Sequence, residues 1–169
     1  MGLRLGTIAA LAAAAAACFG APADAATINA EAKAKVVKPV AIESVQDLDL
    51  GTILLGPGIW SGAIVKLSRS GALTCPTAVT CSGATQVAIY NIVGSNGQTV
   101  VISVPNVTLT NQSDPAKTLT LVPDAQPTVQ LTNSGNPGTD LPIGGSITID
   151  STTADGIYTG TFNVTADYQ

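Results

Sequence analysis

Few side chains in this sequence could carry out chemistry. The 169 residues include no histidine, so the usual general base and the commonest metal ligand are both missing. Two pairs of carboxylates are candidates: Asp47 and Asp49, two apart on one face of a predicted strand, and Asp150 and Asp155, beside Gly156. Such pairs could form a weak calcium site, or a paired acid in the case of the first, but a solvated surface is the simpler interpretation. We therefore expect no enzymatic activity, no metal and no cofactor.

The cysteines indicate a disulfide. Cys18 falls in the leader described below, which leaves Cys75 and Cys81 as an even pair on an oxidising export route. Their spacing does not match the Cys-x-x-Cys motif of redox and zinc sites, and a zinc site would lack histidine. We predict that Cys75 and Cys81 are bonded as a local staple, stabilising the fold by about 2 to 3 kcal/mol.

Residues 1–25 are typical of a secretory signal peptide. Arg4 precedes an apolar run from Thr7 to Phe19, and Ala23-Asp24-Ala25 provides a small-residue cleavage site. The run is about thirteen residues long, which is shorter than the roughly twenty that a membrane-spanning helix needs. An alternative is a lipoprotein box with Cys18 acylated, but Ala15 stands where a branched residue is expected. We expect export to the periplasm and then to the cell surface or the medium.

Composition narrows the class of protein further. Lys and Arg total 7 against 11 Asp and Glu, a net charge of −4, and no basic run exists to neutralise phosphates. Nucleic acid is therefore not an expected partner. Charged residues make up 11% of the chain and hydrophobic residues 46%, a balance that is typical of a folded, secreted all-β domain and not of a disordered one.

Short β-branched runs separated by turn residues predict an immunoglobulin-like, pilin-like β-sandwich over residues 39–169. About seven to nine mainly antiparallel strands are expected. Tight turns are predicted at 95–97, 133–138, 144–145 and 155–156. Residues 68–85 have the weakest strand pattern, so we expect a surface loop or short hairpin there, carrying the disulfide. The predicted strands are a pair around Asp47 and Asp49, then 60–67, 86–93, 99–104, 107–110, 118–122, 128–132 and 146–150.

A segment near the N-terminus, Ile28–Val36, alternates without a fault between apolar and polar residues. Its Ala, Glu and Lys content favours a helix, but its period is two and Pro39 follows closely, so we predict an extended segment over residues 26–38. One face carries Glu31, Lys33 and Lys35. The other carries five small or medium apolar side chains: Ile28, Ala30, Ala32, Ala34 and Val36.

A second alternating segment, Gly156–Tyr168, is predicted to form one strand. Its polar positions, Thr159 to Asp167, face outward. A glycine fourteen places from the last residue and a penultimate tyrosine resemble the motif by which chaperone-usher fimbrial subunits are gripped by their periplasmic chaperone. The inward face is expected to carry Tyr158, Gly160, Phe162, Val164, Ala166 and Tyr168.

Four stretches together resemble a widespread family of secreted Gram-negative domains that is catalogued as a domain of unknown function. They are Gln46–Ile53, Val87–Gly94, Ile143–Ile147 and the closing Gly-x-Tyr-x-Gly-Thr-Phe-x-Val-Thr of Gly156–Thr165, which is the most specific. The resemblance covers nearly all of residues 26–169 and implies a small immunoglobulin-like, pilin-like fold and a role as a surface or fimbrial subunit. The Cys75 and Cys81 pair is not part of the family pattern.

These observations predict a structural subunit of a surface fibre. In that interpretation Ile28–Val36 of one copy completes the sandwich of another by β-strand addition beside Gly156–Tyr168. The partners would be other copies or related subunits, a periplasmic chaperone and an outer-membrane usher. The alternative is a self-complete monomeric sandwich, in which Ile28–Val36 pairs with Gly156–Tyr168 of its own chain and Trp60, if exposed, binds a partner or a carbohydrate.

Overall fold

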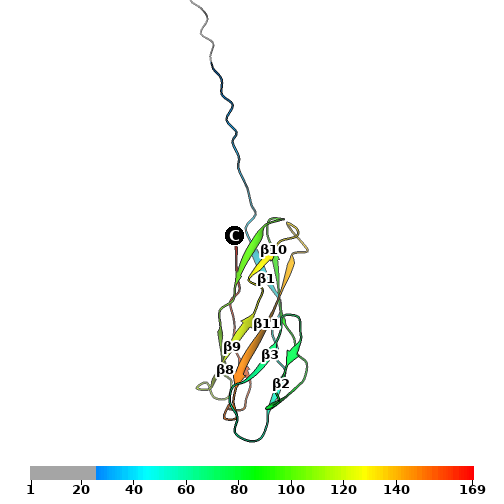
Figure 1. Cartoon of the computed structure of the whole chain (residues 1–169), viewed down its shortest axis with the longest axis vertical. Coiled ribbons are helices and arrows are strands. Elements are labelled where there is room, and N and C mark those ends of the chain that lie inside the picture. The colour runs from blue at the N-terminus through cyan, green and yellow to red at the C-terminus, as the bar shows by residue number, and fades with distance from the viewer. Residues whose placement is uncertain (1–25) are drawn as a thin grey trace, which may run out of the picture. The chain divides into compact units, whose positions relative to one another are not determined.

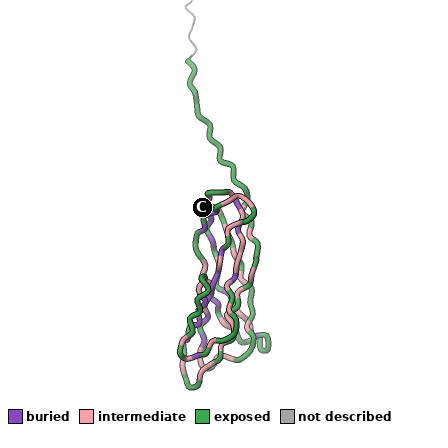
Figure 2. Tube along the Cα trace, turned by 90° about the vertical axis from the view of Figure 1, so that its right-hand side faces the viewer, coloured by how far each residue is buried: buried purple, intermediate pink, exposed green. Residues whose placement is uncertain are grey.

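The computed structural model describes residues 26–169; the predicted signal peptide, with Cys18, lies outside the described residues. The chain divides into a first unit that ends at Lys35 and a second unit, Val36–Gln169. Residues 26–40 contain no strand, and every residue from 26 to 39 is exposed (Figure 2). The described part contains no helix that could cross a bilayer.

The second unit is built from strands alone, and every strand pair in it is antiparallel (Figure 1). The predicted all-β class is therefore confirmed, with more and shorter strands than expected. In chain order they are β1 (Ala41–Gln46), β2 (Thr52–Leu55), β3 (Ala63–Leu67), β4 (Leu73–Thr74), β5 (Val79–Ser82), β6 (Ala88–Val93), β7 (Thr99–Ser103), β8 (Val107–Asn111), β9 (Thr118–Asp124), β10 (Thr128–Gln130), β11 (Thr139–Ile149), β12 (Tyr158–Thr159) and β13 (Thr165–Tyr168).

The strands form one large sheet and two small ones. The large sheet has the order β1-β6-β11-β9-β8-β12, with β3 added beside β11 and β4 beside β3; the small sheets are β10-β7-β13 and β2-β5. Two apolar clusters form the core between them. One is centred on Ile92, Leu131 and Ile143, and the other on Val65 and Leu121. This arrangement is an immunoglobulin-like β-sandwich.

The central strand, β11, corrects one sequence prediction. Gly144-Gly145 was expected to form a turn, and the strand was expected to begin only at Ser146; instead both glycines lie within β11. At this point β11 exchanges neighbours, because Thr139–Ile143 pairs with β6 and Gly145–Ile149 pairs with β3. A Cβ on Gly144 would lie 2.2 Å from the carbonyl oxygen of Leu67, so the glycine is required by close backbone packing and not by a reversal of the chain.

Other strands need smaller corrections. The expected strand pair around Asp47 and Asp49 is present as β1 and β2, but these strands do not pair with each other: β1 pairs with β6, and β2 pairs with β5. Asp47 and Asp49, expected on one face of a strand, lie between β1 and β2 instead, where Asp49 forms an isolated bridge with Gln86. The region 68–85, predicted as a loop or short hairpin, contains the short strands β4 and β5. The sequence pattern located these strands but could not show which neighbour each one would find.

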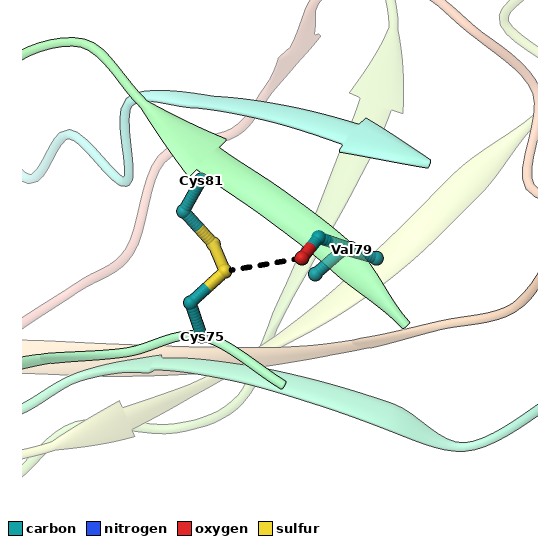
Figure 3. Close-up of a disulfide and its surroundings, with 3 residues drawn as sticks. All are labelled: Cys75, Val79 and Cys81. Atoms are coloured by element: carbon teal, nitrogen blue, oxygen red, sulfur yellow. Dashed lines mark hydrogen bonds between the residues drawn. A yellow bond between two sulfur atoms is a disulfide. The ribbon is translucent and has the colours of Figure 1, made fainter. Parts of the chain in front are cut away.

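The predicted disulfide is present. Cys75 and Cys81 are bonded, with their Cα atoms 6.1 Å apart, and they tie the end of β5 to the loop that follows β4 (Figure 3). The Cys75 sulfur also lies 3.8 Å from the carbonyl oxygen of Val79. Because a disulfide sulfur carries no hydrogen, this is a packing contact and not a hydrogen bond.

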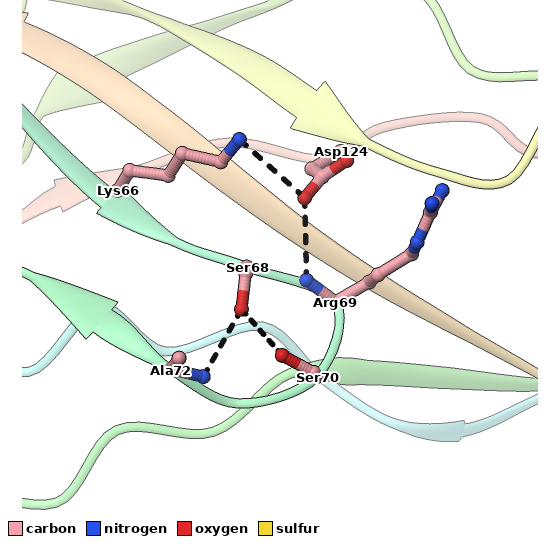
Figure 4. Close-up of polar contacts among 6 residues, drawn as sticks. All are labelled: Lys66, Ser68, Arg69, Ser70, Ala72 and Asp124. Carbon is pink, nitrogen blue, oxygen red and sulfur yellow. Dashed lines mark hydrogen bonds and ion pairs between the residues drawn. The ribbon is translucent and has the colours of Figure 1, made fainter.

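Polar contacts fix the turn between β3 and β4. The Ser68 hydroxyl accepts a hydrogen bond from the Ala72 amide at 3.1 Å, while the Asp124 carboxylate lies 3.7 Å from the Lys66 ammonium and accepts a bond from the Arg69 amide at 3.3 Å (Figure 4). The Arg69 guanidinium points away from Asp124. These contacts are exposed or partly exposed, so each adds little to stability.

Candidate functional site

The segment Gly156–Tyr168, here called the edge segment, is not the single strand that the sequence predicts. It forms two short strands, β12 paired with β8 and β13 paired with β7. The interruption arises in the two strands that the edge segment pairs with. β7 ends at Ser103, β8 begins at Val107, and Pro105 between them has no amide hydrogen to donate. The two ladders are also out of register by one residue, since Thr159 lies opposite Thr110 and Thr165 lies opposite Ser103.

One backbone edge of the edge segment has no strand beside it. Within residues 26–169, all its ladder pairs run to β7 and β8, and two further bonds lie on that same side: the Gln112 amide donates to the Ile157 carbonyl, and the Gln169 amide donates to the Thr99 carbonyl. β13 is the last strand of its small sheet. Its opposite edge therefore presents backbone donors and acceptors that can pair with an added strand.

The side chains of the edge segment are incompletely covered. Every second residue from Thr159 to Asp167 is exposed, and none of the residues from Gly156 to Tyr168 is fully buried. Gly160 is exposed, although it was expected on the inward face. Four inward side chains pack on the core clusters but remain half-buried: Phe162, Val164, Ala166 and Tyr168. Tyr158 is also half-buried, and its hydroxyl donates a hydrogen bond to the Ala154 carbonyl at 2.8 Å.

A groove of about 450 Å³ lies beside this edge. One wall is Ala166–Tyr168, and the other is Val37–Val40, the residues that lead into β1. β1 is itself the last strand of the large sheet. We call this region the seam, because two sheet edges border it, and half-buried side chains from both, including Val40, Ile42 and Val164, cover the first core cluster.

Tyr168 closes one end of the seam. Its hydroxyl donates a hydrogen bond to the Lys38 carbonyl at 2.6 Å and accepts one from the Ser95 amide at 2.7 Å. The Lys38 amide in turn donates to the Ser95 hydroxyl at 2.6 Å. Gly94 makes room for this arrangement, because a Cβ there would lie 2.6 Å from the Tyr168 hydroxyl oxygen. Lys38 lies where the N-terminal segment joins the sandwich, a position that we call the root. The root is thus hydrogen-bonded to the end of the edge segment.

At the other end of the edge segment, Gly156 has a conformational role. Its φ is +137°, in a region that favours glycine, and a Cβ there would lie 2.5 to 2.8 Å from the Asn111 amide group. Asn111 is the one polar residue that is buried within the described chain. It donates to the Asp155 carbonyl at 2.8 Å and accepts from the Ser113 and Asp114 amides.

Sequence reasoning missed Asn111. The available signal was an asparagine followed by Gln-Ser-Asp-Pro, since asparagine side chains commonly accept hydrogen bonds from backbone amides two or three residues on. The geometry explains Gly156 as a turn residue over a buried amide, without reference to any chaperone.

The candidate acids are used locally. Asp49 accepts a hydrogen bond from the Gly51 amide at 2.8 Å, while Asp47 and Asp155 have exposed side chains. Asp150 accepts bonds from the Thr152 hydroxyl at 2.7 Å and the Thr152 amide at 2.8 Å. These bonds, with weaker ones from Thr153, hold the pKa of Asp150 below its ordinary value of 3.8. Residues 26–169 contain no cluster of three potential metal ligands.

The loop 56–62 holds the single tryptophan. Trp60 is half-buried against the second core cluster, and its indole N–H donates to the Gly56 carbonyl at 3.1 Å. The Ser151 amide donates to the Trp60 carbonyl at 3.1 Å, so this loop lies against the turn that precedes Gly156. Ile59, next to Trp60, is fully exposed. The indole therefore serves packing, and the exposed apolar residue is its neighbour.

The alternating segment Ile28–Val36 is exposed along its whole length. Its two largest apolar side chains, Ile28 and Val36, have 91% and 92% of their surface exposed, and Lys33 forms an exposed ion pair with Glu31 at 3.1 Å. Large aliphatic side chains have a higher free energy in water than when they are buried. The segment therefore has an apolar face that this structure leaves uncovered.

Comparison with known proteins gives one match. The family described as "Domain of unknown function (DUF4402)" matches residues 40–168. No curated protein and no solved structure matches the chain. The match spans the sandwich and the whole edge segment, and it begins after the alternating segment.

Proposed function

The chain belongs to the DUF4402 family of domains of unknown function, and on that premise we propose that it is a structural subunit of a bacterial surface fibre, joined to its neighbours by β-strand addition. The observation that carries the proposal is the free edge at the seam. There an unpaired backbone edge coincides with half-buried apolar side chains over the core, including Phe162 and Val164.

The same chain provides a segment suited to this edge. Ile28–Val36 presents apolar side chains at every second residue, which is the spacing of one face of a strand. Three of them, Ala30, Ala32 and Ala34, are small enough for the narrow space between two sheet edges. Covering five such side chains stabilises the joint by about 5 kcal/mol at roughly 25 cal/mol per Å², in addition to the backbone hydrogen bonds that the new ladder forms.

Such a subunit needs protection before assembly. A free edge over a partly uncovered core is a site of unwanted pairing, so a periplasmic chaperone that lends a strand, and an outer-membrane usher that exchanges it for the next copy, are the partners that we propose. We also propose that the subunit is exported by the N-terminal signal and ends at the cell surface.

The proposal is tested with protein sheared from the cell surface and run on a denaturing gel without boiling. Copies joined by strand addition should give a ladder of multimers that collapses to one band on boiling. Ala32→Asp places a charge among the apolar side chains and should abolish the ladder. Asn29→Asp places the same charge on the outward face of the same segment; it is the matched control and should preserve the ladder.

Two results would contradict the proposal. One is a single monomer band from the unmutated protein without boiling. The other is a normal ladder from Ala32→Asp. A monomer band would favour a self-complete sandwich that binds a partner, and attention would then move to the exposed loop around Ile59.

A further inference from the structure

The two ends of the edge segment differ in what lies beside them. Tyr168 is bonded to Lys38, the root of the N-terminal segment of the same chain. The Gly156 end lies next to the turn that contains Ser151, and Ser151 is bonded to Trp60 in the loop 56–62. The direction in which a second copy's segment enters the seam therefore decides which of these surfaces meets that copy.

A segment added parallel to the edge segment would place the guest's Val36 at the Tyr168 end, beside the host's own Lys38. The two roots would then meet, which lets each copy take the other's segment and closes a two-fold dimer. A segment added antiparallel places the guest's Val36 at the Gly156 end, away from the host's root. Only this direction continues head to tail, so a fibre requires it.

The two segments are similar in length, so an antiparallel guest segment would run along nearly the whole edge segment. Nine extended residues, Ile28–Val36, span about 30 Å, and the eleven from Tyr158 to Tyr168 span about 36 Å at roughly 3.3 Å per residue. A guest segment that starts near Tyr168 therefore ends close to Tyr158. Val36 and Val37 of the guest would emerge there, beside the loop 56–62.

The surfaces that would meet are apolar and unoccupied within each described chain. Val36 and Ile59 are almost fully exposed, and Val37 has 42% of its surface exposed. The loop 56–62, Gly-Pro-Gly-Ile-Trp-Ser-Gly, contains no charged residue. Burying an exposed isoleucine against a partner is worth enough free energy to change association about tenfold or more.

Charge at the Gly156 end also suits the guest's root. Two exposed acidic residues, Asp114 and Asp155, belong to this end, because the Asn111 side chain is hydrogen-bonded to the backbone of both. One cation, Lys117, belongs to the same loop. The guest would bring Lys33 and Lys35 on its outward face near the root, so opposite charges face each other.

We infer that the loop 56–62, through Ile59, is a docking surface for Val36 and Val37 of the next copy in the fibre. This inference rests on the proposed function, and it adds the polarity of assembly and the contact that follows the added strand. It assigns to Ile59 a partner that accounts for an isoleucine left in water at a loop tip.

Cysteine pairing tests the inference. The mature protein with Ile59→Cys and Val37→Cys together should form multimers larger than dimers that resist boiling and collapse on reduction. Two cysteines held side by side react at an effective concentration of about millimolar, so this variant should give at least about tenfold more such multimer than the control pair Ile64→Cys with Val37→Cys. Ile64 is exposed on β3 and is not at the proposed contact.

Each outcome is decisive. If the unboiled ladder forms but the Ile59→Cys and Val37→Cys pair does not cross-link, the docking surface is wrong while the proposed function stands. If Val37→Cys alone gives boiling-resistant dimers, the roots meet and the polarity is wrong. If no variant and no unmutated protein gives a ladder, the proposed function fails and this inference fails with it.

Discussion

The strand β11 and the edge segment are similar in length but opposite in environment. β11 is paired along one edge with β6 and then β3, and along the other with β9 over Gly144–Ile147. Leu141, Ile143, Ile147 and Ile149 on it are buried. The edge segment is paired along one side within the described chain, and none of its residues is fully buried.

The difference shows that one strand can hold the core together while another leaves part of the core uncovered. β11 fixes the fold, because it contributes residues to both core clusters and pairs with β6, β3 and β9 of the large sheet. The edge segment covers the core only in part, so its apolar side chains keep exposed surface that a further strand could cover. A strand whose two backbone edges are both paired cannot add another strand. A strand with one unpaired edge is stabilised when a further strand pairs with it.

The largest expected effect would come from truncating a side chain of β11. Ile143 is fully buried, so Ile143→Ala should lower the free energy of unfolding by about 2 to 5 kcal/mol. Phe162→Ala removes more atoms but from a half-buried position, and we expect about 1 to 2 kcal/mol. Urea unfolding of the monomer measures both. If Phe162→Ala proves to be the more damaging change, the distinction between a core strand and an edge strand does not hold.

A smaller effect is expected at the end of the seam. Tyr168→Phe removes the donor to the Lys38 carbonyl and the acceptor of the Ser95 amide, which should cost about 1 kcal/mol because these groups are partly solvated. Hydrogen exchange at the Ser95 amide should speed up at the same time. Tyr90→Phe is the matched control, since the Tyr90 hydroxyl has no hydrogen bond among the described residues. Equal losses from both variants would argue against the Tyr168 contacts.

The smallest effect concerns the turn that joins β11 to the edge segment. The pKa of Asp150 is lowered below 3.8 in the folded state by the Thr152 bonds, so its contribution is fully present above pH 3.8 and is lost as the pH falls through the lower, folded-state value. Asp150→Asn does not titrate. Its stability deficit relative to the unmutated protein should be constant at neutral pH and shrink in acid. A deficit that grows in acid would show that the direction is wrong.

Most of the fold could be predicted from the sequence, because alternation of β-branched and polar residues marks individual strands. The positions of β7, β8, β9 and β10 agree closely with the expected ranges. Pairing could not be predicted in the same way. Gly144-Gly145 satisfies a tight turn and a crowded strand equally well, and only the approach of Leu67 in three dimensions distinguishes them.

Part of the candidate site could be predicted from the sequence. The alternation that placed Phe162, Val164, Ala166 and Tyr168 on one face agrees with their burial. The break in the edge segment could not be predicted from its own residues, because its cause lies at Pro105 in a different part of the chain. The hydrogen bonds of Tyr168 to Lys38 and Ser95 join residues that are far apart in the sequence, so no local sequence pattern predicts them.

The ladder between the edge segment and β7 has a mechanical consequence. In a fibre joined through the seam, tension enters at the root near Lys38 and leaves along the added strand, so the load runs parallel to the strands. Hydrogen bonds loaded in this direction share the force and must shear together, whereas a hairpin pulled sideways opens one bond at a time. The seam would therefore resist pulling more strongly than its equilibrium stability alone suggests.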